Sequence, residues 1–363
     1  MYSMALDTDG NLWAWWDELF VLAASTNLPS RERSRPDIIM TDVIDFASSG
    51  MGYAFAITSD NVLWGWGFNE FGELGDGTTQ NHMNPVRIMD GAALVETTRM
   101  HNRLFETAAM MPRFTYVIGT DGRLWQWGVD IVDSRPVAVP RRHILDNIAQ
   151  VSIGRAQVIT NPAFTLAVTT DGTLWGWGNT AGGVLGIEGI DFAEEPVKIM
   201  ENARYAFGGN LFSAAIRKDN SLWTWGFSTS GNELFDVTAP SGHTRINPSR
   251  VFDNVESVMF YSIGTEVIRT DGSLWNFRLL HGDSEPRMVM ENVQWRSGID
   301  TNAHWIITKD GDLLRPARSH QRIIDTPDGP RTQEVNFEEY VLLRNVVAAE
   351  TSFSSIFSLN RLP

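Results

Sequence analysis

One short element recurs along the chain, and it constrains the fold more than any other feature. Each copy has an aspartate, then a glycine or an asparagine, and two residues later a leucine that is followed in six of the seven copies by tryptophan. The copies are centred on Trp13, Trp64, Trp125, Trp175, Trp223, Trp275 and, in a degraded copy, Leu314, at intervals of 39 to 61 residues. Repeats of this length are typical of propellers and solenoids.

The turn chemistry is the same in all copies. Five copies carry Asp-Gly and two carry Asp-Asn, and both pairs suit a type I′ turn, whose central residues need positive φ. Each copy therefore predicts a β-hairpin, for example residues 54–57 followed by residues 62–66. Alternation along the second strand places Trp64 and Trp66 on one face and Leu63 with Gly65 on the other. Both faces are largely apolar, so we expect both to be covered.

A proline precedes most copies and predicts a further strand. It opens the segments 36–40, 85–89, 136–139, 196–200, 248–252 and 286–290. Proline at the first position of a strand favours a sheet edge, so we interpret these segments as outermost strands. Apolar runs such as 151–153 and 255–258 then supply inner strands. Four short strands per unit and no convincing helix predict an all-β fold, a seven-bladed β-propeller that forms a single domain over residues 1–363.

The ends of the chain predict how the ring closes. Residues 2–6 align with residues 53–57, so the first unit lacks the strands that should precede it. Residues 345–349 and 355–359 have the pattern of those strands. We expect the N- and C-terminal strands to pair, which would remove exposed sheet edges. An incomplete eighth blade is the alternative.

These motifs resemble a known family. The pattern x-Asp-Gly-x-Leu-Trp-x-Trp-Gly, followed by Asn-x-x-Gly-x-Leu-Gly-x-Gly and Pro-Val, is similar to the regulator of chromosome condensation repeat; residues 63–86 match best and residues 174–197 next. The resemblance implies a propeller. It leaves the function open, because the family includes a guanine-nucleotide exchange factor on chromatin, a plant ultraviolet-B receptor and bacterial β-lactamase inhibitors. The receptor's Gly-Trp-Arg-His-Thr signature is absent, and the nearest segment is 294–298.

Composition excludes several classes of partner and site. The formal net charge is −15, and only Lys198, Lys218 and Lys309 are lysines. Without a basic stripe we expect no nucleic-acid binding, and no apolar run is long enough for membrane insertion. The chain has no cysteine, which rules out disulfides and thiolate metal sites. It also favours an exported or cell-surface bacterial protein, although no signal peptide precedes Met1.

No residue pattern predicts catalysis, a cofactor or a metal. Residues 7–11 resemble the start of a calcium loop, but the remaining ligands are missing, and we interpret the segment as a hairpin turn. The glycine loops lack the Gly-Lys-Ser/Thr of a phosphate cradle. Histidines show no metal-ligand spacing, and no nucleophile, base and orienting residue occur together. The sequence therefore predicts a non-enzymatic protein.

We expect the chain to bind another protein through loops that differ between blades. The candidate residues are Glu70, Phe71, Glu73 and Asp76 in one acidic loop, and Arg99, His101 and Arg103 in a longer insertion. Trp16, Trp295 and Trp305 lie outside the repeat positions and suggest the first alternative, a cell-envelope or glycan-binding domain. A guanine-nucleotide exchange factor-like regulator is the second alternative, on the family resemblance alone.

Overall fold

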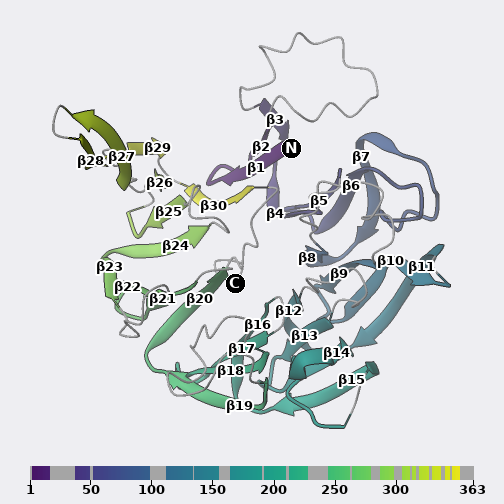
Figure 1. The fold of residues 1–363 in the computed structure, drawn as a ribbon. Coiled ribbons are helices and arrows are strands. Elements are labelled where there is room, and N and C mark those ends of the chain that lie inside the picture. Colours follow the sequence, from purple (N-terminus) through teal and green to yellow (C-terminus); the bar gives the residue numbers. More distant parts are fainter. Residues whose placement is uncertain are drawn as a thin grey trace.

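The described part of the chain is built mainly of β-strands arranged around a centre (Figure 1). The structure is a computed structural model, and it describes residues 2–16, 37–49, 52–98, 112–133, 135–154, 164–189, 192–209, 212–227, 244–261, 264–278, 287–297, 305–310, 313–315, 319–326, 329–336, 340–343 and 346–351. Within these residues the strands form seven four-stranded antiparallel sheets and one two-stranded sheet. The four-stranded sheets are the blades of a β-propeller.

The strands of the first three blades run as follows. Blade 1 holds β1 (Tyr2–Asp7), β2 (Leu12–Trp16), β3 (Asp37–Met40) and β30 (Val346–Thr351). Blade 2 holds β4 (Val43–Ser48), β5 (Tyr53–Thr58), β6 (Val62–Gly67) and β7 (His82–Asp90). Blade 3 holds β8 (Ala92–Thr97), β9 (Arg113–Gly119), β10 (Leu124–Val132) and β11 (Arg135–Leu145).

The other four blades repeat the same order. Blade 4 holds β12 (Ile148–Gly154), β13 (Phe164–Thr169), β14 (Leu174–Asn179) and β15 (Phe192–Met200). Blade 5 holds β16 (Ala203–Gly208), β17 (Phe212–Arg217), β18 (Leu222–Phe227) and β19 (Thr244–Phe252). Blade 6 holds β20 (Val255–Tyr261), β21 (Gly264–Arg269), β22 (Leu274–Arg278) and β23 (Arg287–Met290). Blade 7 holds β24 (Val293–Ser297), β25 (Trp305–Thr308), β26 (Leu313–Arg315) and β29 (Tyr340–Leu343).

Two short elements complete the described chain. The segment between β26 and β29 includes the hairpin of β27 (Ser319–Thr326) and β28 (Gly329–Asn336), which stands away from the blades in Figure 1. The one helical element described is the 3₁₀ turn η1 (Ala181–Gly183). The described part of the chain has no helix with the length and hydrophobicity needed to span a membrane.

The predicted hairpins are confirmed. β5 pairs antiparallel with β6, with Ala56 opposite Trp64 and Ile57 opposite Leu63. The expected turn type was wrong, because in the described turns only the second residue of the pair has positive φ, for example 63° at Asn61 and 76° at Gly122. Asn61 N donates to Thr58 O (2.8 Å), so the strands are joined by a three-residue turn that ends in a left-handed residue instead of a type I′ turn. Each repeat centre, from Trp13 to Leu314, lies in the third strand of its blade in chain order, counting β30 as the first strand of blade 1.

The prediction for the outermost strands was wrong in one respect. In three blades the proline does not open the strand: β7 begins three residues before Pro85, and β15 and β19 begin four residues before Pro196 and Pro248. In each strand the proline lies inside a bulge, as between the Gly65–Val86 and Gly67–His82 pairs of blade 2. A bulge interrupts the ladder, so the missing proline N–H leaves no ladder bond unmade.

The terminal strands meet in blade 1. β30 pairs antiparallel with β1, with Ser3 opposite Thr351 and Leu6 opposite Ala348. One of the two C-terminal segments expected to complete this blade therefore does so. The other, residues 355–359, lies outside the described residues.

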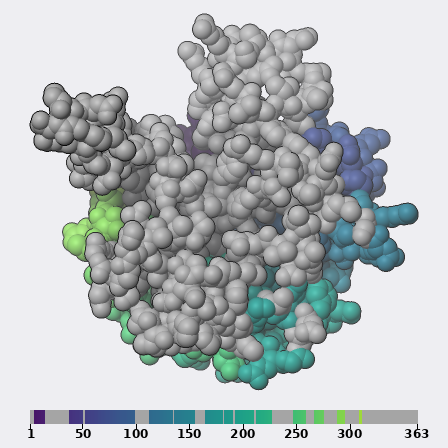
Figure 2. All heavy atoms as spheres, viewed as in Figure 1, coloured from purple at the N-terminus to yellow at the C-terminus, as the bar shows by residue number. Residues whose placement is uncertain are grey.

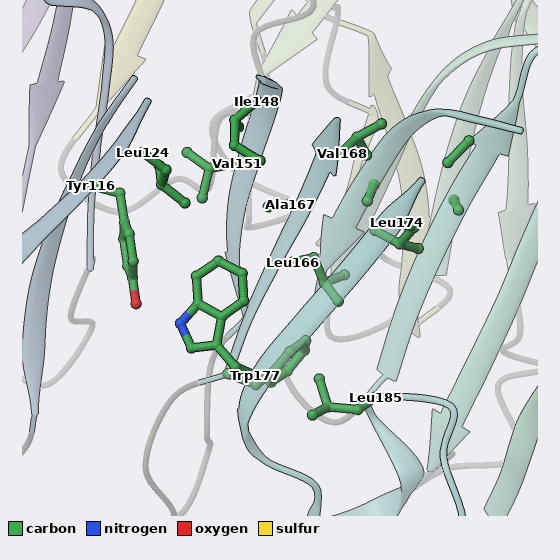
Figure 3. Close-up of a cluster of buried hydrophobic side chains, with 14 of the residues drawn as sticks. Tyr116, Leu124, Ile148, Val151, Leu166, Ala167, Val168, Leu174, Trp177 and Leu185 are labelled. Atoms are coloured by element: carbon green, nitrogen blue, oxygen red, sulfur yellow. The ribbon is translucent and has the colours of Figure 1, made fainter. Parts of the chain in front are cut away.

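Packing between blades uses the second tryptophan of the repeat. Trp127 and Trp225 are fully buried. Trp127 packs against Phe55 and Leu74 of blade 2, and Trp225 packs in one cluster with Leu185 of blade 4. Trp177 occupies the same position in blade 4 and meets Tyr116 of blade 3, with ring centroids 5.9 Å apart (Figure 3). Blades 3, 4 and 5 thus each bury an indole against the blade before it.

The two faces of the ring differ, because antiparallel strands of one blade end alternately on opposite faces. Short turns join the second strand to the third and each blade to the next, and they lie on one face, here called the turn face. The remaining connections, including 68–81, 98–112, 155–163, 180–191 and 228–243, join strand ends on the other face, here called the loop face. The variable connections of the repeats thus all begin and end on one side of the ring.

The turn face is held by a regular pattern of hydrogen bonds. At every junction from blade 1 to blade 7, the first amide of the new blade donates to a carbonyl in the preceding Asp-Gly or Asp-Asn turn. Ala92 N to Asn61 O (2.9 Å) is an example. A second bond runs between the blades, as from Thr120 N to Gly91 O (2.7 Å). This pattern ties consecutive blades together on the turn face.

Candidate functional site

The loop of residues 68–81 on the loop face holds four of the predicted binding residues, more than any other described segment. It joins β6 to β7 and lies over the junction between blades 2 and 3. Gly75 lies against Trp127, because a Cβ at Gly75 would be 2.4 Å from the indole nitrogen. At Gly72 a Cβ would be 3.5 Å from that of Ala138 in β11. The loop is therefore part of the contact between the two blades.

Asn69 organises the loop from its interior. Its side chain is completely buried. The amide oxygen accepts from Leu74 N (2.9 Å), and the amide nitrogen donates to the Asp76 carboxylate (3.0 Å) and to Thr78 O (3.1 Å). Buried polar groups need such partners to offset desolvation. The asparagine of the repeat pattern is thus a structural residue that closes the loop.

Asp76 is the second organising residue. Its carboxylate accepts from Thr78 N (2.8 Å) and from Asn69, and lies 2.8 Å from His82 Nε2. Burial acts to raise the pKa of Asp76, but hydrogen bonds from Thr78, Asn69 and His82 outweigh it and hold the pKa below its ordinary value. The carboxylate therefore stays charged near neutral pH, and its hydrogen bonds hold the loop together.

Glu73 lies between the blades. Its Oε1 accepts from Arg113 Nη2 at 2.9 Å, and the two side chains are only 6% and 3% exposed. Its Oε2 accepts from Phe71 N (2.9 Å), and its carbonyl accepts from Trp127 Nε1 (3.2 Å). The expectation that Glu73 is available to a partner is therefore wrong, because its carboxylate is used inside the protein.

Glu70 and Phe71 are the predicted residues of this loop that remain accessible. Glu70 is exposed and Phe71 is half-buried. The Phe71 ring lies 5.6 Å from the Arg113 guanidinium carbon, a cation–π contact that fixes the ring. The buried Arg113 thus holds both ends of the Phe71–Glu73 segment. A rigid loop presents one acidic and one aromatic side chain to solvent.

A buried tyrosine lies close to this ion pair. Thr97 Oγ1 donates to the Tyr53 hydroxyl (3.2 Å), and Tyr53 is 2% exposed. Burial is the main reason that the pKa of Tyr53 rises to about 12. The hydroxyl therefore stays neutral at physiological pH, so it adds no charge beside Glu73 and Arg113.

Comparison with known proteins identifies the repeat. Residues 60–96 match the model of the Regulator of chromosome condensation (RCC1) repeat. The solved structure of Prp20p from Saccharomyces cerevisiae superposes with a TM-score of 0.61 at 17% identity, covering 86% of this chain and 82% of that one. The chain is therefore a β-propeller, and its residues 60–96 carry an RCC1-type repeat.

Curated relatives match over shorter stretches. The ultraviolet-B receptor UVR8 of Arabidopsis thaliana is 28% identical over 90 residues, which are 24% of this chain and 20% of the receptor. The guanine nucleotide exchange factor SRM1 of Saccharomyces cerevisiae is 25% identical over 122 residues, 33% of this chain and 23% of that protein. The alignments thus span less than a quarter of the length of these relatives.

The other predicted binding residues are spread over the propeller. Trp16 ends β2 of blade 1, Trp295 is in β24 and Trp305 begins β25. The backbone of Trp305 pairs with Ser297 in blade 7. The three tryptophans thus belong to blades 1 and 7, whereas loop 68–81 belongs to blade 2. Their side chains lie outside the described residues, as do Arg99, His101 and Arg103 entirely. Binding by these residues stays a prediction.

The described residues contain no group of three or more histidine and acidic side chains able to hold a metal ion. In the calcium-like segment, the Asp7 carboxylate accepts from Asp9 N, Asn11 N, Asn11 Nδ2 and Trp13 Nε1, at 2.8 to 3.0 Å. These donors occupy the oxygens that a cation would need. The segment is therefore a hairpin turn of the propeller repeat.

Sequence reasoning missed two features. Arg113 follows the long insertion and carries no repeat signal, so its pairing with Glu73 was not foreseeable. The turn-face bonds did have a signal. An acidic residue followed by asparagine or glycine and a small or β-branched residue recurs at 90–92, 146–148, 201–203, 253–255 and 291–293. The middle residue has positive φ in each, for example 57° at Asn147 and 60° at Asn202.

Proposed function

We propose that this RCC1-type propeller is a non-enzymatic protein that binds another protein through its loop face. One observation carries the proposal: the variable connections share one face, while the turn face is closed by a repeated pattern of hydrogen bonds. Rigid scaffolds with variable loops on one side are suited to recognition.

The loop of residues 68–81 supports this proposal in detail. Asn69, Asp76 and the Glu73–Arg113 pair hold its backbone, so little conformational entropy is lost when Glu70 and Phe71 meet a partner. An aromatic side chain beside an acidic one suits a partner surface that combines an apolar pocket with a basic rim. We place Glu70 and Phe71 at the centre of the contact.

Affinity capture with matched variants tests this proposal. A partner is cross-linked to the intact chain and identified, and its affinity is then measured for Glu70→Lys, for Phe71→Ala and for Ser59→Arg. Ser59 is exposed on the turn face and serves as the control. Phe71→Ala should weaken binding by about tenfold or more, the effect of removing an aromatic anchor, while Ser59→Arg should change nothing. Equal loss with the turn-face variant would contradict the proposal.

Guanine-nucleotide exchange is a second candidate. It is supported by the relative SRM1, which is named an exchange factor, and by the fold of Prp20p, whose structure is described with its binding to Gsp1p and histones. Release of a fluorescent guanine nucleotide from a Ras-family GTPase measures this activity. Acceleration by the intact chain would favour exchange, and its loss in Phe71→Ala would place exchange on the same face.

A further inference from the structure

Blade 3 differs from its neighbours on the loop side of its third and fourth strands. In blades 2 and 4 these strands are joined by loops with the Leu-Gly pair that covers the next tryptophan. In blade 3, β10 and β11 instead continue as a long hairpin, with Val129 opposite Ala138 and Val132 opposite Arg135. The hairpin reaches the edge of the molecule (Figure 1 and Figure 2).

The register assigns the residues of this hairpin to its two faces. Ala138 approaches Gly72, so the face of Val129 and Ala138 is turned toward blade 2. The other face therefore carries Asp130, Val132, Arg135, Val137, Val139 and Arg142, because residues opposite one another in a ladder share a face. The ladder has a bulge between Val139 and Arg142. Arg142 therefore lies opposite Gln126, on the same face as Val139 opposite Gly128.

This second face combines free cations with exposed apolar side chains. Val132 and Val137 are 50% and 44% exposed, and Arg135 and Arg142 are exposed. Among the residues that the structure describes, neither arginine has a carboxylate within ion-pair distance. Arg142 Nε donates to the neutral Gln126 Oε1 (2.9 Å), which orients the guanidinium without neutralising it. Asp130, half-buried, is the one acidic residue on this face.

In three other outermost strands the cation opposite the first tryptophan of the repeat is paired. Arg87 pairs with Asp90, Lys198 with Glu201 and Arg250 with Asp253, each three residues along the chain. At the same position of β11, His143 lies 3.0 Å from the Asp146 carboxylate, whereas Arg135 and Arg142 lie elsewhere on the strand. β11 runs Arg-Pro-Val-Ala-Val-Pro-Arg-Arg-His-Ile-Leu and contains no acidic residue. Its uncompensated arginines stand out on a chain with a net charge of −15.

We propose that this face of the β10–β11 hairpin binds an extended acidic segment of a partner protein. The two arginines lie opposite Val132 and Gln126 of β10, so they are separated by about 20 Å at the rise of a strand. An extended segment with acidic residues at both ends and aliphatic residues between them matches this spacing and the valines. Guanidinium groups recognise carboxylates through paired hydrogen bonds.

The same observations disfavour two other modes of binding. A long nucleic acid would extend past the hairpin onto acidic surface, and the attraction of two arginines does not reach beyond the screening length of about 8 Å. Addition of a continuous strand to β11 is hindered by Pro136 and Pro140, which lack N–H donors. Recognition is therefore assigned to side chains and to an acidic peptide.

Fluorescence anisotropy with the intact chain tests this assignment. The probe is a labelled peptide in which two glutamate pairs flank about six residues of alternating valine and serine, the length that spans the two arginines. Wild-type protein should bind it, and added salt should weaken binding. Arg135→Gln with Arg142→Gln should reduce affinity about tenfold, as expected for two surface ion pairs. Val137→Ser should reduce it further.

Two control variants, a peptide of opposite charge and an oligonucleotide decide the outcome. Arg250→Gln removes a paired arginine from another outermost strand and should leave binding unchanged. Glu70→Lys should also leave it unchanged, so that failure here is separate from failure of the proposed loop-face function. Equal binding of a lysine-for-glutamate peptide, or no effect of the paired arginine substitutions, would overturn the proposal. A single-stranded oligonucleotide that bound more tightly through the same arginines would overturn it in favour of nucleic acid.

Discussion

At the scale of single residues, the Glu73–Arg113 pair links blade 2 to blade 3. Both side chains are buried, and breaking a buried ion pair leaves a charge without its partner. We expect Glu73→Ala to lower the free energy of unfolding by about 3–5 kcal/mol. Urea denaturation followed by circular dichroism measures this change.

A double variant provides the control for this pair. Glu73→Ala combined with Arg113→Met removes both charges, so its cost should be smaller than the sum of the two single costs. A cost below about 1 kcal/mol for Glu73→Ala would place the pair in the range of exposed pairs and contradict its burial.

Asp76 makes a contribution that depends on pH. Its pKa is lower in the folded loop than in the unfolded chain, so folding favours the charged form. Its stabilisation is fully present above the unfolded pKa of about 4 and is lost as pH falls through the lower folded value. We expect Asp76→Asn to destabilise by about 1–3 kcal/mol at pH 7, and by less in acid. Denaturation at several pH values measures the difference, and a constant difference would contradict this role.

At the scale of elements, the leucine-glycine pair of the loop seals the junction between blades. A Cβ at Gly75 would lie 2.4 Å from Trp127 Nε1, whereas one at Gly77 would meet nothing within 4 Å, and φ is positive at both. Gly77→Ala therefore measures backbone strain alone, about 1–2 kcal/mol. Gly75→Ala should cost about 1–3 kcal/mol more, because it also overpacks the junction.

The equivalent loop of blade 4 repeats this comparison. Gly186 would place a Cβ 3.2 Å from the Trp225 ring, and Gly189 would meet nothing. Thermal unfolding should rank the alanine variants with Gly75 most damaging, Gly186 next, and Gly77 and Gly189 least. Equal effects at Gly75 and Gly77 would show that the contact with Trp127 contributes nothing.

Local chemistry accounts for what was predictable in these elements. Asp-Gly and Asp-Asn pairs specify a turn through backbone conformation alone, so the hairpin over Asn61 could be read directly. The role of Glu73 could not be predicted from the sequence, because an acidic residue in a glycine-rich loop is normally solvated. Its burial depends on Arg113, which lies 40 residues further along the chain. The unusual blade 3 hairpin was likewise hidden, since Pro136 resembles the prolines of the other outermost strands.

At the scale of the whole molecule, the number of repeats predicted the ring, and both termini contribute to one sheet. The sequence left open which C-terminal segment pairs with β1, because residues 345–349 and 355–359 have similar apolar patterns. The structure selects β30, with Met4 opposite Glu350 and Ala5 opposite Ala349. Ladder partners depend on the position of neighbouring blades, which pattern alone does not encode.

Truncation from the C-terminus tests the importance of this pairing. Removing residues 346–363 deletes β30, whereas removing residues 352–363 keeps it and is the matched control. The five residue pairs between β1 and β30 should contribute roughly 3–6 kcal/mol at the usual value per hydrogen bond. The longer truncation also exposes the edge of β1, which favours association with other chains. We expect a lower melting temperature and larger particles by light scattering for the longer truncation only, and equal behaviour of the two would contradict a stabilising role for β30.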